Sequence, residues 1–337
     1  IIKDAKKGKM FILVDNKDRE NEGDLVVPAS KINHEKINFM AKHGRGLICL
    51  ALTSQKVKKL KLPLMSLINK SRTQTAFTVS IESKKGISTG ISAFDRAKTI
   101  KVAIKPSSTN KDIVSPGHVF PLVAKNGGVL ERAGHTEASI DISKLANLNP
   151  SSVICEVMNE DGTMARYKDL IPFSKKHNLK IAKIEDLISY RLKNERLIKF
   201  VMKRKIKLNK FGTLDLKIFK NKLDESESYA ITKGKFSYKK PSRVRVISAN
   251  ILNNYLNFNN NIFKNSLNYL NRFNNFALIL VKNSNQNQNS SDDNKILRYY
   301  GVGAQIIKEL KIKNMILVSR SKERVIALKG YGIQITK

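Results

Sequence analysis

The sequence predicts an α+β domain, with a mixed sheet and flanking helices, followed by an α/β domain. The first observation is length, because 337 residues suggest two domains. The second is composition, because 41% hydrophobic residues can form substantial cores. The third is the pattern of short apolar runs, some with strand spacing and some with helical spacing. We place the domain boundary between residues 1–197 and residues 198–337.

The first domain is expected to mix strands and helices. Strands are predicted where apolar residues run together or alternate, at residues 10–14, 47–52, 76–81 and 153–157. Helices are predicted where apolar residues recur at helical spacing, at residues 31–43, 92–102 and 184–200. Gly and Pro punctuate residues 115–134, so His118 and His135 are expected on or beside loops.

The second domain is expected to begin with a Lys-rich strand at residues 203–207. Residues 250–294 then contain 17 asparagines in 45 positions, and so polar a segment is expected to be a partly disordered insert. Beyond it, the apolar pattern predicts helices at residues 303–310 and 322–329 and a strand at residues 315–318.

The net charge of +35 raises the question of a nucleic-acid partner. The basic residues are spread along the chain, since residues 1–200 carry 36 basic and 20 acidic side chains and residues 201–337 carry 27 and 8. With no Trp and 7% aromatic residues, platforms for base stacking are not expected. The charge therefore favours attraction of small anionic substrates, phosphates above all. A basic nucleic-acid-binding protein stays open as an alternative.

Several features indicate a cytoplasmic protein with no membrane partner. The longest apolar runs are too short to span a bilayer. The basic start is followed by only five apolar residues, at 10–14, which is too short for a secretory signal. Two cysteines, Cys49 and Cys155, exclude a disulfide framework and a four-cysteine zinc site. Cys49 lies in an apolar run and is expected to be a buried core residue.

A concentration of acidic residues is the most informative local feature. Five acidic residues lie within residues 15–24, although the chain as a whole is strongly basic. This concentration calls for a local cation, and a divalent metal ion with oxygen ligands is the simplest candidate. Glu20 from this stretch and His135 from a second stretch could ligate such an ion together. Each alone could also be an ordinary solvated or hydrogen-bonding residue.

Further candidates lie near His135 and in two other segments. Arg132 and Thr136 flank His135 and could hold a phosphate, helped by the backbone N–H groups around Gly134. His118 could move a proton near neutral pH. Glu156, at the end of a predicted strand, could act as an acid or a base, or could simply pair with a lysine. Together these residues predict a site that enolises a sugar phosphate on a metal ion.

Six segments, in order along residues 1–197, resemble the signature of the 3,4-dihydroxy-2-butanone 4-phosphate synthases. They are residues 15–24 with Arg-Glu-Asn-Glu-Gly-Asp at their core, 45–49 (Arg-Gly-Leu-Ile-Cys), 89–93 (Thr-Gly-Ile-Ser-Ala), 116–122 (Pro-Gly-His-Val-Phe-Pro-Leu), 132–137 (Arg-Ala-Gly-His-Thr-Glu) and 154–156 (Ile-Cys-Glu). Enzymes of this family use Mg²⁺ or Mn²⁺ to convert ribulose 5-phosphate into formate and the four-carbon precursor of riboflavin.

The resemblance implies a role for each matching residue. Glu20 and His135 match metal ligands, and His118 and Glu156 match residues that the family needs for catalysis. Substrate contacts are implied for Arg19, Glu20, Asp24, Arg132, Ala133, Gly134, His135, Thr136 and Glu156. The resemblance also implies a homodimer with its active sites near the subunit interface.

Residues 198–337 resemble GTP cyclohydrolase II, which is fused to this synthase in many bacteria. The matching segments are residues 244–246, 297–307 and 330–333. An active cyclohydrolase of this family holds zinc with three cysteines, but the chain has no cysteine after Cys155. Ile-Ser-Ala-Asn at residues 247–250 replaces the family's His-Ser-x-Cys, and the Glu-Gly-Arg-Gly run with the catalytic arginine is absent.

We therefore expect a degenerate second domain, with no zinc and no cyclohydrolase activity. Structural support, dimer contacts and regulation of the first domain stay open as its role, and so does a remnant with no function. A bifunctional enzyme that also opens GTP is the alternative.

Overall fold

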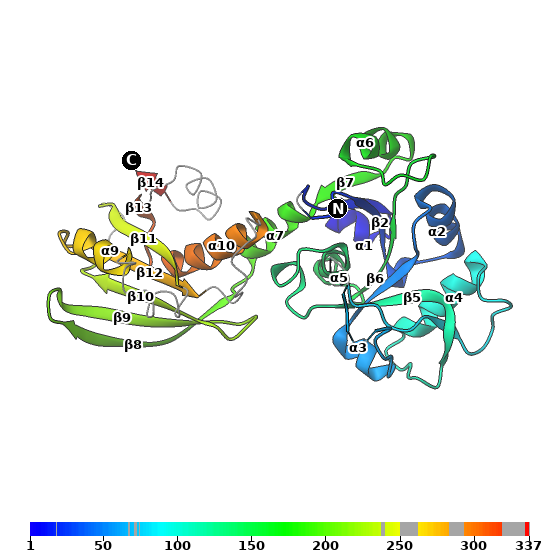
Figure 1. Cartoon of the computed structure of the whole chain (residues 1–337), viewed down its shortest axis with the longest axis horizontal. Helices are drawn as coiled ribbons and strands as arrows, with labels where there is room; N and C mark the ends of the chain where they lie inside the picture. The colour runs from blue at the N-terminus through cyan, green and yellow to red at the C-terminus, as the bar shows by residue number, and fades with distance from the viewer. Residues whose placement is uncertain are drawn as a thin grey trace. The chain divides into compact units, whose positions relative to one another are not determined.

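In the computed structural model the chain forms two compact units, Ile1–Leu187 and Ile188–Lys337 (Figure 1). The structure describes residues 1–17, 19–66, 68–70, 73, 75–236, 240–249, 262–282, 293–318 and 334–336. Each unit contains a mixed sheet with helices beside it, so the predicted fold class is confirmed. The units divide inside helix α7 (Ile184–Asn194), ten residues before the predicted domain boundary. The predicted boundary at residues 197–198 separates the two expected functional domains, and it stays a prediction.

The described strands of the first unit form one sheet in the order β4-β5-β3-β6-β2-β1-β7. Their bounds are β1 (Phe11–Val14), β2 (Gly23–Pro28), β3 (Cys49–Thr53), β4 (Ile81–Ser83), β5 (Ile113–Ala124), β6 (Ser151–Glu156) and β7 (Lys180–Lys183). β3 is parallel to β5 and β1 is parallel to β7, whereas the other neighbours are antiparallel. β1 and β2 are buried at every position, because elements pack on both faces of the sheet.

Helices cover the two faces of this sheet. Their bounds are α1 (Ile2–Lys6), α2 (His34–Phe39) with a π-helical turn at Met40–Gly44, α3 (Ser54–Lys59), α4 (Ala93–Ile104), α5 (His135–Leu145) and α6 (Tyr167–Lys176), with 3₁₀ turns at Ala29–Lys31 and Gly128–Leu130. Ile37 of α2 and Ile100 of α4 pack with Leu50 in the main core. The next residue along β3, Ala51, packs with Ile140 of α5. Since neighbouring strand residues face opposite ways, α5 covers the other face (Figure 1).

Most predicted elements of the first domain are present, but three local predictions were wrong. The helix predicted at residues 184–200 ends at Asn194, and residues 198–200 already belong to strand β8 (Ile198–Leu208). Residues 76–81 form isolated bridges at Phe77 and Thr78, and the strand β4 begins only at Ile81. No regular strand forms here, because Thr78 N–H donates to Pro121 O while Val79 N–H donates to Pro63 O, so consecutive residues pair with different segments.

His118 was expected on or beside a loop, yet it lies within the long strand β5. Ile81 pairs with Val119 while Glu82 pairs with Val114, so the residues between them bulge from the strand. The Pro-Gly pair at 116–117 therefore marks a bulge rather than the end of a strand.

The described strands of the second unit have the order β14-β13-β11-β12-β10-β9-β8. The neighbouring pairs β8–β9, β9–β10 and β10–β12 are antiparallel. The pairs β12–β11, β11–β13 and β13–β14 are parallel. The bounds are β8 (Ile198–Leu208), β9 (Gly212–Asn221), β10 (Glu227–Lys233), β11 (Ser242–Ala249), β12 (Phe276–Lys282), β13 (Asn314–Leu317) and β14 (Gln334–Thr336), with helices α9 (Ile262–Leu270) and α10 (Asp293–Glu309). The predicted strands at 203–207 and 315–318 and helix at 303–310 match β8, β13 and α10.

The Asn-rich tract contains ordered elements that the sequence did not predict. Helix α9 buries Leu267 and Leu270, and β12 lies in the middle of the sheet. The remaining parts of the tract, 250–261 and 283–292, lie outside the described residues, as do the predicted helix at 322–329 and the motif at 330–333.

Polar contacts join α7 to α10 in the second unit. Gln305 Nε2 donates to Leu192 O and to Glu195 O, both at 2.8 Å, and Gln305 Oε1 accepts from Leu197 N–H.

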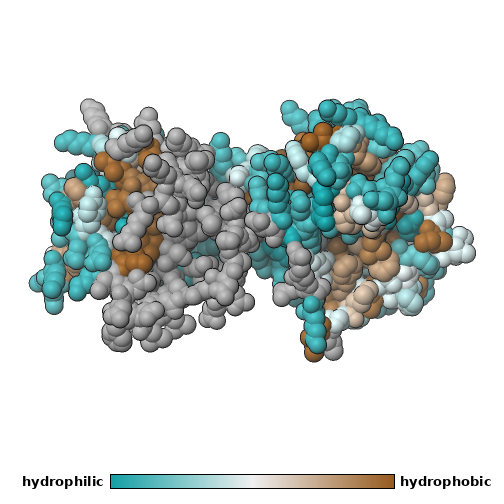
Figure 2. All heavy atoms as spheres, turned by 45° about the horizontal axis from the view of Figure 1, so that its top comes forward, coloured by the Kyte–Doolittle hydropathy of each residue, from teal (hydrophilic) through white to brown (hydrophobic). Residues whose placement is uncertain are grey.

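Apolar side chains also reach the surface of the molecule (Figure 2). No helix among the described residues is both long enough and apolar enough to cross a membrane.

Candidate active site

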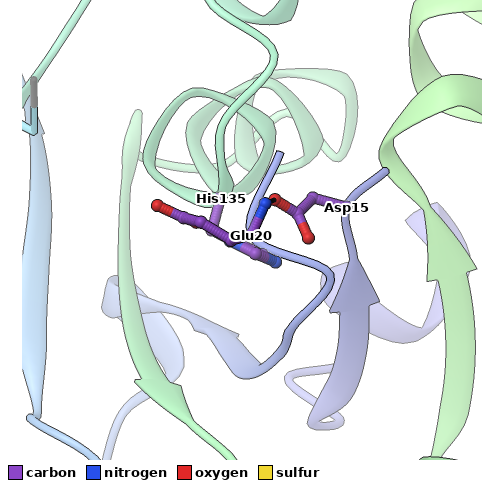
Figure 3. Close-up of side chains that lie close together, drawn as sticks. All are labelled: Asp15, Glu20 and His135. Atoms are coloured by element: carbon purple, nitrogen blue, oxygen red, sulfur yellow. Dashed lines mark hydrogen bonds and ion pairs between the residues drawn. The ribbon is translucent and has the colours of Figure 1, made fainter. Parts of the chain in front are cut away.

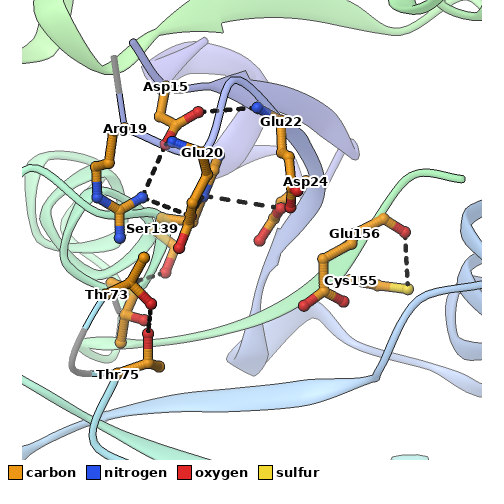
Figure 4. A network of polar contacts seen from close by, with 12 residues as sticks. Asp15, Arg19, Glu20, Glu22, Asp24, Thr73, Thr75, Ser139, Cys155 and Glu156 are labelled. Atoms are coloured by element: carbon orange, nitrogen blue, oxygen red, sulfur yellow. Dashed lines mark hydrogen bonds and ion pairs between the residues drawn. The ribbon is translucent and has the colours of Figure 1, made fainter. Parts of the chain in front are cut away.

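The acidic stretch forms a turn between β1 and β2 that folds around one carboxylate. Asp15 follows β1 directly and is buried. Its carboxylate accepts from Arg19 Nη1 at 2.8 Å and from the backbone N–H groups of Glu20 and Glu22 at 3.1 and 2.9 Å (Figure 4). The chain reverses at Asn21, where φ is +56°. Asp15 is not among the predicted site residues, but it sets the shape of the turn that carries Glu20; Asp18 lies outside the described residues.

His135 is the first residue of α5, and it lies against this turn. Its Nδ1 is 3.6 Å from Glu20 Oε2 and 3.8 Å from Asp24 Oδ1. Ligand atoms of Asp15, Glu20 and His135 all lie within 4.8 Å of one another (Figure 3). His135 Nε2 is buried and has no hydrogen-bond partner among the described residues. The structure therefore brings the predicted metal ligands together, with a ring nitrogen left over for a further bond.

The electrostatics of this cluster reflect its surplus of carboxylates. Burial opposes ionisation of Glu20, but the nearby His135 and the charge of Arg19 lower the pKa of Glu20 to about 2. Burial likewise disfavours a charged His135, but Asp24, Glu20 and Asp15 raise the pKa of His135 to about 9. Burial, together with the nearby Glu156 charge, raises the pKa of Asp24 to about 8. At neutral pH, protons on His135 and Asp24 thus offset part of the negative charge.

Strand pairing sets Glu156 beside this cluster. Asp24 of β2 is opposite Glu156 of β6 in the sheet register. Glu156 Oε2 accepts from the backbone N–H of Leu47 at 2.9 Å. Gly46 permits this approach, because a Cβ there would be 2.6 Å from Glu156 Oε2. Glu156 is therefore fixed next to Asp24, on the side of β6 opposite to the core residue Cys155.

Arg132 joins the start of α5 to Thr73 and Thr75. Its Nη1 donates to Glu137 at 2.6 Å, and its Nη2 donates to Thr73 O at 3.1 Å and to Thr75 Oγ1 at 2.9 Å. Gly134 leaves room for the Arg132–Glu137 pair, because a Cβ at Gly134 would lie 2.4 Å from Arg132 Nη1. The guanidinium predicted to hold substrate therefore also orders two threonines.

These side chains surround a cavity of about 640 Å³. Most of the predicted site residues line it: Arg19, Glu20, Asp24, Arg132, His135, Thr136 and Glu156. Ala133 and Gly134 do not line it; Ala133 is buried, and Gly134 is the residue that permits the Arg132–Glu137 contact.

The cavity also has walls that the sequence did not reveal. Among them are Glu22, Cys49, Thr73, Thr75 and Lys125. Cys49 is buried, as predicted, but it contributes to the cavity wall. Its position within the Arg-Gly-Leu-Ile-Cys motif was the available signal. The threonines and Lys125 carry no pattern of their own.

His118 is the one predicted catalytic residue that does not line the cavity. Its side chain is 44% exposed, and its Nδ1 is hydrogen-bonded to Glu82 Oε1. Phe120, two residues further along β5, pairs with Cys49 of the cavity wall. His118 thus lies in the exposed first half of β5, and β5 is the neighbour of β3 in the sheet. The residues that contact Glu156, Gly46 and Leu47, lie just before β3.

Comparison with protein-family models gives two matches. Residues 1–190 match the 3,4-dihydroxy-2-butanone 4-phosphate synthase family, and residues 264–337 match the GTP cyclohydrolase II family.

Curated relatives and solved structures agree with the first match. The chain is 41% identical to riboflavin biosynthesis protein RibBA of Aquifex aeolicus, over 100% of this chain and 90% of the relative. It is 40% identical to 3,4-dihydroxy-2-butanone 4-phosphate synthase of Photobacterium phosphoreum, over 100% and 97%. A solved structure of RibBX, a two-domain synthase from A. baumannii, superposes with a TM-score of 0.86 at 39% identity, covering 100% of this chain and 98% of that one. A synthase solved in complex with two magnesium ions matches with a TM-score of 0.55 at 36% identity, covering 58% and 95%.

Proposed function

The chain belongs to the 3,4-dihydroxy-2-butanone 4-phosphate synthase family of riboflavin biosynthesis, and from this we propose that it converts D-ribulose 5-phosphate into 3,4-dihydroxy-2-butanone 4-phosphate and formate. The observation that carries the proposal is the cavity in which Glu20 and His135 lie near Glu156 and a group of hydroxyl and basic side chains. The five carbons of the substrate are all accounted for by the four-carbon product and formate. We place the reaction in the cytoplasm, where the two free cysteines would stay reduced.

A divalent metal ion, Mg²⁺ or Mn²⁺, is part of this proposal. Glu20 and His135 would hold it, with Asp15 close enough to contribute or to orient Glu20. The unpaired Nε2 of His135 and the surplus of carboxylates fit such an ion. When bound, the ion would polarise the substrate's oxygens and stabilise the negative charge that enolisation creates. The magnesium-bound relative supports this choice of metal.

The phosphate group is proposed to bind among Thr73, Thr75, Lys125 and Thr136. Thr136 lies in the first turn of α5, where free backbone N–H groups favour an anion. Arg132 holds the two threonines of residues 73–75 by direct hydrogen bonds. We therefore assign Arg132 both a charge near the phosphate and the ordering of this segment.

Two residues are proposed to move protons. Glu156 takes the proton from C3 when the sugar enolises, since its carboxylate is fixed at the cavity wall. His118 gives a proton to the C1 hydroxyl, which leaves as water. The carbon skeleton then rearranges, and C4 takes up water and leaves as formate. Water lost in one step is regained in the other, so the reaction balances without a co-reactant.

His118 does not reach the cavity of its own chain, so we propose that the enzyme is a homodimer in which His118 of the partner subunit completes the site. Exposed apolar side chains support an interface on the first unit, because Leu47, Ile91, Phe94 and Val114 are 41%, 53%, 65% and 42% exposed. Leu47 directly follows Gly46, which contacts Glu156, and Val114 shares strand β5 with His118.

Mixing two inactive variants tests this arrangement. Glu20→Ala and His118→Ala are each expected to abolish formate release while the fold is kept. If His118 serves the partner's site, a mixture allowed to exchange subunits should recover about a quarter of wild-type activity, because half of the dimers then contain one intact site of two. Wild-type turnover in either variant would exclude its catalytic role. Failure of the mixture to recover, despite verified subunit exchange, would place His118 in its own chain's site.

The second unit is proposed to lack cyclohydrolase activity and zinc. The chain has no cysteine after Cys155, so no thiolate can hold zinc there to activate water. Residues 264–337 nevertheless match the cyclohydrolase II family, and an active second unit is the alternative.

One assay tests both units. Formate release should be measured from ribulose 5-phosphate with and without Mg²⁺, and from GTP with Zn²⁺. Metal-dependent formate from the sugar phosphate alone is the expected result. Formate from GTP would contradict the inactive second unit, and none from the sugar phosphate would contradict the synthase.

A further inference from the structure

We propose that Arg166 is a positioning residue for the metal-binding turn: its guanidinium clamps the backbone at Glu20 and Asn21 and so sets where the Glu20 carboxylate lies. Arg166 is outside the segments that carry the family resemblance, and it does not line the cavity. The inference rests on the proposed function, because it concerns the same site.

The clamp consists of two hydrogen bonds to one turn. Arg166 Nη1 donates to Glu20 O at 2.6 Å and to Asn21 O at 2.8 Å. The chain reverses at Asn21 with a left-handed φ, so these two carbonyl oxygens cannot be satisfied by regular secondary structure. Asp15 holds the N–H groups of the same turn, at Glu20 and Glu22. The turn is thus fixed through its N–H groups by Asp15 and through its carbonyl groups by Arg166.

Arg166 is itself held in place by helix α6. Its backbone N–H donates to Asp169 Oδ2 at 3.0 Å, at the start of the helix. One turn later Leu170 is fully buried, and it packs so closely on Gly23 that a Cβ there would be 2.4 Å from Leu170 Cδ1. Gly23 is the first residue of β2, directly after the turn. The packing of α6 therefore brings the guanidinium to the turn without help from the ligand.

Charge supports the same role. Arg166 Nη1 is 3.6 Å from Glu22 Oε1, and Glu22 lines the cavity. A cation at this position lowers the repulsion among the carboxylates of the turn. Because Arg166 acts through Glu20 and Glu22, its loss should change the affinity for the metal ion. The fold-change in metal affinity should exceed the fold-change in KM for the sugar phosphate at saturating metal.

The test uses the full chain and three variants. Mg²⁺ affinity is measured by calorimetry without substrate for wild type, Arg166→Gln, Arg166→Lys and the control Lys168→Gln. Lys168 is exposed and lies two residues further along the same segment, so its variant removes the same charge without touching the turn. Melting curves establish that each variant is folded.

Arg166→Gln is expected to weaken Mg²⁺ binding by roughly 10–100-fold, as loss of an outer-shell partner commonly does. Arg166→Lys should lose less than about tenfold, since it keeps the charge but not the planar guanidinium. Lys168→Gln should match wild type. Equal affinity in wild type and Arg166→Gln would overturn the inference, and so would an equal loss in Lys168→Gln.

Hydrogen exchange separates this inference from the proposed function. In metal-free protein, the amides of residues 19–22 should exchange faster in Arg166→Lys and Arg166→Gln than in wild type. Unchanged exchange rates would overturn the clamp even if the enzyme is active. If wild type neither binds Mg²⁺ nor releases formate, the proposed function fails, whereas faster exchange in the variants would still support the clamp.

Discussion

At the scale of single residues, the decisive feature is an imidazole surrounded by carboxylates. Asp15, Glu20 and Asp24 raise the pKa of His135 to about 9, and the imidazolium in turn helps to lower the pKa of Glu20 to about 2. In the metal-free protein a proton on His135 supplies part of the positive charge that a divalent ion would supply. If His135 ligates the ion as proposed, the proton and the metal ion compete for the same ring.

This competition predicts how metal affinity depends on pH. His135 must lose its proton to ligate Mg²⁺, so the apparent affinity should rise from pH 6.5 to 9, by up to about tenfold per pH unit for each proton released, and level off above that. Calorimetry in buffers of different ionisation enthalpy measures the protons released. An affinity independent of pH over this range would contradict ligation by His135.

The same shift predicts the stability of the metal-free protein. The pKa of folded His135 lies above its ordinary value of 6.5, so its contribution to stability is complete below pH 6.5 and is lost as the pH rises through 9. The melting temperature in EDTA should therefore fall between pH 6.5 and 9, and saturating Mg²⁺ should reduce that fall. An equal fall with and without Mg²⁺ would count against this coupling.

Much of the site could be predicted at this scale, for a physical reason. Acidic residues concentrated in a basic chain stand out in the sequence, and so does a histidine in a Gly-containing segment. Thr73, Thr75 and Lys125 do not stand out, because only the folding of the chain brings such common residue types to one cavity. Asp15 lay in the acidic stretch, but its role depends on hydrogen bonds that spacing does not reveal.

At the scale of elements, the bulge in β5 places the candidate catalytic histidine. Gly117 N–H donates to Ser80 Oγ, and His118 is hydrogen-bonded to Glu82 of the neighbouring strand. A Cβ at Gly117 would lie 2.2 Å from the carbonyl carbon of Ile81, so the bulge fits its neighbour only with glycine at this position.

Gly117→Ala is therefore expected to displace His118 and to lower kcat by more than tenfold. We expect it to destabilise the protein by about 1–3 kcal/mol, as overpacking does. Mg²⁺ affinity should stay unchanged, because Glu20 and His135 lie on other elements. Gly162→Ala is the matched control: Gly162 has φ +85° and open space around it, so alanine should cost only about 1–2 kcal/mol of backbone strain and leave kcat intact. Wild-type kcat in Gly117→Ala would show that the bulge does not position His118.

Elements with one clear hydrophobic period were predictable from the sequence. A segment whose backbone hydrogen bonds go to two different segments was not. Helix α4 is amphipathic and is capped at its start by Ser92, whose side chain accepts from Asp95 N–H, so both its pattern and its start are local. Residues 76–81 alternate like a strand but divide their hydrogen bonds between two segments. Helix α9 and strand β12 were not predicted, because they lie in the polar, Asn-rich tract. The burial of Leu267, Leu270 and Phe276 outweighs that polar composition.

At the scale of the whole molecule, the net charge of +35 predicts a salt-dependent reaction rate. A doubly charged sugar phosphate is drawn to a basic protein, and this attraction is screened within about 10 Å at 0.1 M salt. With metal saturating, kcat/KM should fall several-fold between about 20 mM and 500 mM salt, while kcat at saturating substrate stays nearly constant. Steady-state rates at several ionic strengths measure this. A kcat/KM that does not change with salt would mean that the charge plays no part in substrate capture.

The two-unit architecture and its fold class were predictable from length, composition and apolar pattern. The position of the structural division was not, because residues 184–200 show one helical pattern that carries no mark of where one unit ends. Helix α7 begins in the first unit, and Ile188 and Leu192 are fully buried in the second. Gly301 of α10 lets the two helices approach, since a Cβ there would be 2.6 Å from Leu192 Cδ2.

That single helix bears on how such a chain could change over evolutionary time. If the second unit lacks cyclohydrolase activity, as proposed, replacement of its zinc-binding cysteines would have removed that one reaction. The body of the second unit is harder to discard, since a stop codon after the synthase would expose Leu192, which lies against Gly301 of α10, on the end of a helix that begins in the first unit. Selection on the first reaction alone would then be enough to preserve the scaffold of the second.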